Sequence, residues 1–141
     1  MKKLILTACI FTISLSINAQ TIFGKWENRD EESGKVNSVI EVYEKDGKAF
    51  AKIVEITNPE RKDAVCDKCD GDNKNKPILG MDILTGLEKD GSEWSGGEIL
   101  DPKKGKVYKC FIELQGKNKL KVRGYLGVSL FGRTVYWHRK S

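Results

Sequence analysis

The chain has 141 residues, with 25 Lys and Arg against 20 Asp and Glu, and a formal net charge of +5. The charges are spread along the chain and no basic block stands out, which argues against nucleic acid as the main partner. A chain of this length can bury one hydrophobic core, so we expect a single domain.

The first 19 residues have the layout of a secretory signal peptide. Two lysines precede an apolar run that ends near Ile17, which is too short and wrongly flanked for a membrane-spanning helix. We expect cleavage after Ala19 and a periplasmic or secreted domain of residues 20–141. An alternative is that Cys9, in the sequence LTAC, becomes the lipidated first residue, although the apolar run before it is very short.

The remainder of the chain alternates apolar and polar residues in short segments, and none of them keeps helical spacing for three turns. Asp46-Gly47 and Asp90-Gly91 mark hairpins, because such pairs adopt the positive φ of tight turns. Eight or nine strands are expected, within residues 21–28, 38–56, 81–89, 93–100, 107–115, 119–126 and 129–140. The pattern predicts an all-β antiparallel up-and-down meander, closed into a small barrel, with one long irregular loop near 57–80.

The alternation also predicts which side chains face the interior. Tyr108, Cys110 and Ile112 share one face of their strand, where Cys110 is expected to be a small buried hydrophobe. On the last strand the expected inward face carries Phe131, Arg133, Val135, Trp137 and Arg139.

Residues from both ends of the domain are expected to close the barrel. Gly24 and Trp26 on the first strand, with Arg139 near the end of the last, resemble the signature of lipocalins and their calycin relatives. A guanidinium stacked on the indole would plug one end of the barrel.

Arg133 is the main candidate for contact with a ligand. An inward arginine halfway down a small barrel could hold a carboxylate or phosphate bidentately, or it could pair with an internal acid such as Asp82 or Glu98. The other candidate lining residues are Tyr108, Ile112, Val122 and Phe131.

Cys66 and Cys69 lie three apart in the long loop, among acids, amides and lysines. A four-ligand zinc site would be incomplete, and the acidic residues that follow lack the final glutamate of a calcium loop. The residues after Cys69 do not form the helix start of a thioredoxin-type pair. We therefore expect a local disulfide or dithiol that shapes an exposed loop, with no metal and no cofactor.

Several stretches resemble the exported bacterial family known as domain of unknown function 2147. They are GKW at 24–26, SVIEVYEKDGK at 38–48, CDKCDGDNKNKPILGMDIL at 66–84, WSGGEILDPKKGKVY at 94–108 and LKVRGYLGVSLFGRTVYWHR at 120–139. The resemblance implies an exported lipocalin-like β domain. It implies no activity and supplies no catalytic residues.

Three functions are open at this point. The first is a monomeric envelope protein that binds a small apolar or amphipathic molecule inside the barrel. The second is a filled barrel that docks on another envelope protein through residues 57–80. The third, a thiol redox or metal-binding protein that uses Cys66 and Cys69, has the least support, and we expect no enzymatic activity.

Overall fold

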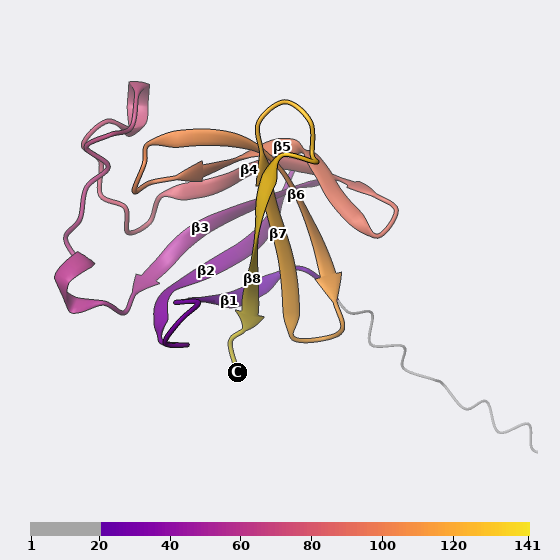
Figure 1. Cartoon of the computed structure of the whole chain (residues 1–141), viewed down its shortest axis with the longest axis horizontal. Helices are drawn as coiled ribbons and strands as arrows, with labels where there is room; N and C mark the ends of the chain where they lie inside the picture. The colour runs from indigo at the N-terminus through magenta and orange to yellow at the C-terminus, as the bar shows by residue number, and fades with distance from the viewer. Residues whose placement is uncertain (1–20) are drawn as a thin grey trace, which may run out of the picture.

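The computed structural model describes residues 21–141, so the expected signal peptide, its cleavage site and the alternative at Cys9 lie outside the described residues. Eight antiparallel strands follow one another around a closed barrel, and β8 returns to pair with β1 (Figure 1). This confirms the predicted all-β up-and-down barrel. The strands are β1 (Gly24–Arg29), β2 (Val36–Lys45), β3 (Lys48–Ile56), β4 (Asp82–Asp90), β5 (Glu93–Asp101), β6 (Lys106–Gln115), β7 (Lys119–Tyr125) and β8 (Gly132–Arg139).

Tight turns join the strands at one end of the barrel. Between β2 and β3, Asp46 and Gly47 have φ values of 53° and 76°, which is the pair of positive angles that a two-residue hairpin of this twist requires. Similar short turns join β4 to β5 and β6 to β7. We call this the closed end, because the core fills it.

The core of the closed end comes from the inward side chains of successive strands. Trp26 is completely buried, and its indole N–H donates to the carbonyl oxygen of Ile22 at 2.8 Å. Leu87, Ile112 and Leu120 are also fully buried around it. Burial of these large side chains stabilises the closed end through the hydrophobic effect.

The other end, which we call the open end, carries the longer connections. They are residues 30–35, 57–81, 102–105 and 126–131. The segment 57–81 contains only two single-turn 3-10 helices, at Pro59–Arg61 and Gly71–Asn73, and an isolated bridge between Val65 and Pro77. Figure 1 shows it as the magenta to pink excursion from the barrel, beside the orange turn between β5 and β6.

The long segment is largely exposed, as the sequence indicated, but its two cysteines are buried. Cys66 and Cys69 form a disulfide, and their exposed fractions are 0% and 1%. They pack, together with Ile78, into the same hydrophobic cluster as the barrel core. The cysteines are buried because the turn between β5 and β6 lies directly over the pair, with the Pro102 carbonyl oxygen 3.3 Å from the Cys66 sulfur.

Among residues 21–141, no helix is long and apolar enough to cross a membrane.

Candidate ligand-binding site at the open end

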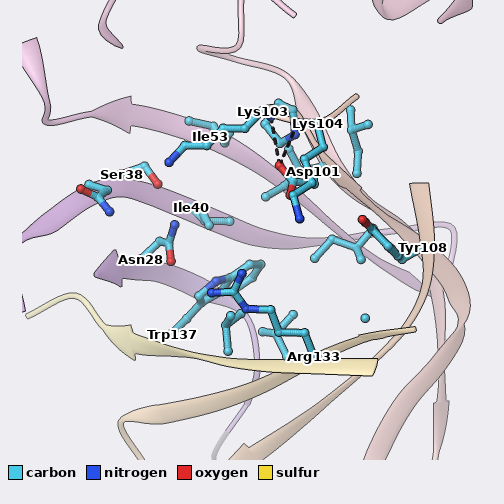
Figure 2. A pocket seen from close by; sticks show the side chains of 18 of the residues that line it. Asn28, Ser38, Ile40, Ile53, Asp101, Lys103, Lys104, Tyr108, Arg133 and Trp137 are labelled. Carbon is cyan, nitrogen blue, oxygen red and sulfur yellow. Dashed lines mark hydrogen bonds between the residues drawn. The ribbon is translucent and has the colours of Figure 1, made fainter. Parts of the chain in front are cut away.

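A cavity of about 870 Å³ opens at this end of the barrel (Figure 2). Its floor is apolar and made of inward side chains from four different strands: Ile40, Ile53, Val122 and Trp137. Each of them is no more than 5% exposed, so the floor is the upper surface of the packed core. The barrel is therefore filled in one half and hollow in the other.

Small and polar inward residues keep the upper half hollow. Gly124 on β7 faces the cavity, and a Cβ atom at this position would lie 3.5 Å from a methyl of Ile99 and 3.6 Å from Tyr108. A side chain would therefore fit there, and its absence leaves the space open. Asn28 and Ser38 bring an amide and a hydroxyl to the wall on β1 and β2 (Figure 2).

The rim of the cavity is charged. Arg133 forms an ion pair with Glu31, with 3.2 Å between Nη2 and Oε1. Across the opening, the carboxylate of Asp101 accepts hydrogen bonds from the backbone N–H groups of Lys103 and Lys104, at 3.0 and 3.4 Å. These bonds hold the β5–β6 turn so that its two lysines line the cavity (Figure 2). A molecule with an apolar body and an anionic group matches an apolar floor below cationic side chains.

The predicted ligand-contact residues lie at different depths. Tyr108 is half-buried and lines the cavity, and Val122 forms part of the floor. Ile112 is fully buried in the core beneath the floor and does not line the cavity. Phe131 precedes β8, on the loop at the rim, and its side chain is 72% exposed instead of pointing inward.

Arg133 also differs from expectation. It was placed halfway down the barrel, but β8 begins at Gly132, so Arg133 is the second residue of the strand and lies at the rim. Its side chain is 73% exposed, and its partner is Glu31 from the β1–β2 turn. The acid Asp82 instead accepts a hydrogen bond from the Tyr43 hydroxyl at 2.6 Å. Burial is the main cause that raises the pKa of Tyr43 to about 12, and the hydrogen bond to Asp82 is the second.

Sequence reasoning missed Asn28, Ser38, Lys103, Lys104 and Trp137 as members of the site. The alternation did contain a signal, since Asn28 follows Trp26 by two residues and Ser38 precedes Ile40 by two. No such signal points to Lys103 and Lys104, because they lie on a turn whose position over the barrel depends on the long 57–81 segment.

At the closed end, the Arg139 guanidinium lies 4.3 Å from the centre of the Trp26 ring system. It also donates three hydrogen bonds to backbone carbonyl oxygens, those of Lys117 at 2.8 Å, Phe23 at 3.3 Å and Thr21 at 2.7 Å. Gly24 lies against the same group, where a Cβ atom would be 3.4 Å from Nη1. One side chain thus joins the first strand, the last strand and the β6–β7 turn.

The remaining cysteine, Cys110, lies inside the barrel wall and is 1% exposed. Burial raises the pKa of its thiol to about 12. The thiolate form, which is the reactive one, is therefore suppressed near neutral pH.

Comparisons with known proteins agree with this geometry. The model of a bacterial family described as "Uncharacterized protein conserved in bacteria (DUF2147)" matches residues 24–139. A solved structure, described as "Protein HP1028 from the human pathogen Helicobacter pylori belongs to the lipocalin family", is similar with a TM-score of 0.74 and 20% identity, over 86% of this chain and 84% of that one. At this identity the likeness shows the fold alone. A comparison with curated proteins finds no match.

Proposed function

The chain belongs to the bacterial DUF2147 family, and from this premise we propose that it is an exported carrier that binds a small apolar or amphipathic molecule in the open end of its barrel. The observation that carries the proposal is the half-hollow barrel, with about 870 Å³ of space above an apolar floor. Proteins seldom leave a cavity of this size between packed strands, because empty space forfeits dispersion contacts. The similar structure, which is named as a lipocalin, shares the barrel fold on which this proposal rests.

In this proposal the apolar part of the ligand lies on Ile40, Val122 and Trp137, and Tyr108 contacts its side. An anionic group would lie at the rim, which carries Arg133 on one side and Lys103 and Lys104 on the other. Arg133 can exchange its exposed ion pair with Glu31 for a ligand carboxylate, since such a pair contributes little to stability. Ile112 supports the floor from below without ligand contact.

The hollow end favours this function over the filled barrel that docks through residues 57–80. The long segment is built into the domain by its buried disulfide and its contact with the β5–β6 turn. A redox role is also less favoured, because both cysteines of the pair are out of reach of a substrate in the folded chain.

The test is native mass spectrometry of protein exported from cells and purified without detergent, alongside Gly124→Leu. The variant places a side chain in the cavity at a position where a Cβ has room. Lys121→Leu adds the same side chain on the same strand, outside the cavity, and serves as the control.

We expect a small molecule to accompany the wild type and the control, and to be lost from Gly124→Leu. A bare chain in all three samples, together with no binding of fatty acids to the wild type by calorimetry, would contradict the proposal.

A further inference from the structure

The loop between β7 and β8 has an unusual surface for a connection. Leu126, Val128, Leu130 and Phe131 are 62%, 59%, 79% and 72% exposed, so four large apolar side chains stand in solvent within six residues. We call these four side chains the apolar tip. Monomeric proteins rarely expose such a cluster without a partner for it.

The apolar tip is held in place and is not a frayed end of the hairpin. Arg123 on β7 donates from Nε to the Ser129 carbonyl oxygen at 2.9 Å and from Nη2 to that of Leu130 at 3.3 Å. Its Nη1 donates to the Thr134 hydroxyl at 2.8 Å, which ties the loop to the start of β8. The Phe131 N–H closes a turn onto the Val128 carbonyl oxygen at 3.1 Å. The backbone thus presents the apolar side chains in a preset arrangement.

The charge around the tip is strongly one-sided, although no continuous basic block stands out in the sequence. Residues 103–141 contain eleven Lys and Arg but a single acid, Glu113, whereas residues 20–102 contain twelve Lys and Arg and nineteen acids. The strands β6, β7 and β8 are neighbours in the barrel (Figure 1), so the basic residues that they carry lie on one part of its wall. We call β6–β8 with the preceding residues 103–105 the basic wall. In the sequence these basic residues alternate with apolar ones, so they do not form a continuous run of charge.

The tip and the basic wall are continuous. Lys109 pairs in register with Tyr125, the residue before the tip, and Val107 extends the apolar surface on β6 with 49% exposure. Tyr136 on β8 is 40% exposed, with Lys119 over its ring at 4.3 Å. The open end also carries acids, on the β1–β2 turn, in the 57–81 segment and at Asp101 on β5, and Glu31 among them is already paired with Arg133.

We propose that this hairpin docks the protein on a phospholipid bilayer that contains anionic lipids, with the apolar tip inserted between headgroups and the basic wall against them. Apolar side chains that stand out beside cations fit a surface with an apolar interior and an anionic face. A polyanion such as nucleic acid would match the basic wall but offers nothing to the four apolar side chains. Leu126 and Phe131 also line the cavity, so docking would bring its opening to the lipid surface. The docking itself does not depend on a ligand in the cavity.

The experiment is co-sedimentation of the exported protein with vesicles of phosphatidylcholine alone, or of phosphatidylcholine mixed with phosphatidylglycerol. The tip variant is Leu130→Ser with Phe131→Ser. Its control is Val65→Ser with Leu79→Ser, two exposed apolar residues of the long segment. The charge variant is Lys104, Lys106 and Lys109→Gln, and its control is Lys25, Lys45 and Lys89→Gln, all exposed lysines outside the basic wall.

We expect the mixed vesicles to bind the wild type at least about tenfold more tightly than the neutral ones, and high salt to weaken that binding. The tip variant should bind the mixed vesicles at least about tenfold more weakly, because the Leu and Phe side chains that the wild type transfers from water into the lipid are missing. The affinity of the charge variant for mixed vesicles should fall by a similar factor. The affinities of both controls should stay within about twofold of that of the wild type.

Binding of the tip variant as tight as that of the wild type would overturn the proposal, as would no binding to mixed vesicles. A dimer in sedimentation velocity that the tip variant abolishes, without vesicle binding, would assign the tip to a second copy of the chain. Retention on a nucleic acid column without vesicle binding would assign the basic wall to another polyanion and also overturn it.

Discussion

Arg139 joins the two ends of the domain at the closed end of the barrel. Its planar guanidinium stacks on Trp26 and donates to three carbonyl oxygens, two just before β1 and one in the β6–β7 turn. Only three residue pairs join β1 to β8, so the seam of the barrel is short and the arginine reinforces it. This combination of stacking and fork-shaped donation is specific to arginine.

We predict that Arg139→Ala lowers the free energy of unfolding by about 2 to 3 kcal/mol, because the carbonyl oxygens and the indole face lose a charged partner. Arg139→Lys should recover less than half of the loss, since an ammonium cannot reach all three acceptors. Urea unfolding of both variants measures this. Lys140→Ala, an exposed neighbour, is the control. Equal stability of Arg139→Ala and Lys140→Ala would show that the pairing of β1 with β8 does not depend on the contacts of Arg139.

Cys110 gives a second prediction at the scale of one residue. The raised pKa of its thiol, about 12, means that the folded protein should react with iodoacetamide at pH 8 far more slowly than a free cysteine does. Unfolding in urea should restore the ordinary rate. A mass increase of one adduct per chain within minutes, under native conditions, would show that β6 opens readily.

The raised pKa of the Cys110 thiol also makes the free energy of unfolding depend on pH. The folded state keeps the proton above pH 9.0, where the unfolded thiol begins to lose it. This contribution to the free energy of unfolding is therefore complete below pH 9 and is lost as the pH rises toward 12. Cys110→Ala should show a smaller loss of stability over that window, as measured by urea unfolding. An identical pH dependence in both proteins would contradict it.

At the scale of elements, the long 57–81 segment and the β5–β6 turn form one unit. Gly105 makes the contact possible, since a Cβ atom there would lie 2.0 Å from the Lys68 carbonyl oxygen. The disulfide beneath them fixes the backbone that the turn covers. This unit forms one side of the cavity rim and places Lys103 and Lys104 there.

Gly105→Ala tests the close approach against a matched control. Gly105 and Gly116 have nearly the same φ, 65° and 69°, but nothing lies within 4 Å of a Cβ at Gly116. Alanine at either position should cost about 1 kcal/mol for its backbone conformation. At Gly105 the clash should add at least about 2 kcal/mol. Thermal unfolding of the two variants gives the difference, and equal costs would mean that the segment moves aside freely.

The disulfide should act locally. It closes a ring of only four residues, so its effect through the entropy of the unfolded chain is at most about 2 kcal/mol. We expect Cys66→Ala with Cys69→Ala to leave the barrel folded. Amide hydrogen exchange should increase in residues 61–78 and 101–105, and stay unchanged in β1 and β8. Global unfolding of the double variant would show that the pair stabilises the whole domain.

At the scale of the whole molecule, the barrel is polarised twice: one end is filled and the other hollow, and one wall is basic while the rest is acidic. The two asymmetries meet at the loop between β7 and β8. A modest net charge conceals this arrangement, because electrostatic attraction to a surface depends on the charge that faces it.

Ion exchange should reveal the charge polarity without any membrane. Lys104, Lys106 and Lys109→Gln and Lys25, Lys45 and Lys89→Gln each remove three positive charges, so the two variants have equal net charge. On a cation-exchange column at pH 7, the first should elute at clearly lower salt than the second, because it loses the lysines that face the resin. Coincident elution would show that the charges act only through their sum.

Local signals in the sequence are enough to predict the fold, because apolar and polar alternation and positive-φ turn pairs leave an up-and-down barrel as the simplest way to pair all strand edges. The sequence also indicated the arginine and tryptophan that meet at the closed end. Only the tertiary structure decided the depth of each inward residue, which is why Ile112 lies below the floor and Arg133 and Phe131 lie at the rim. Depth depends on the stagger of strands around the barrel, which alternation does not encode. The tertiary structure also decided the burial of the disulfide, because the distant β5–β6 turn lies over it, and it placed the consecutive strands β6, β7 and β8 side by side in the barrel wall.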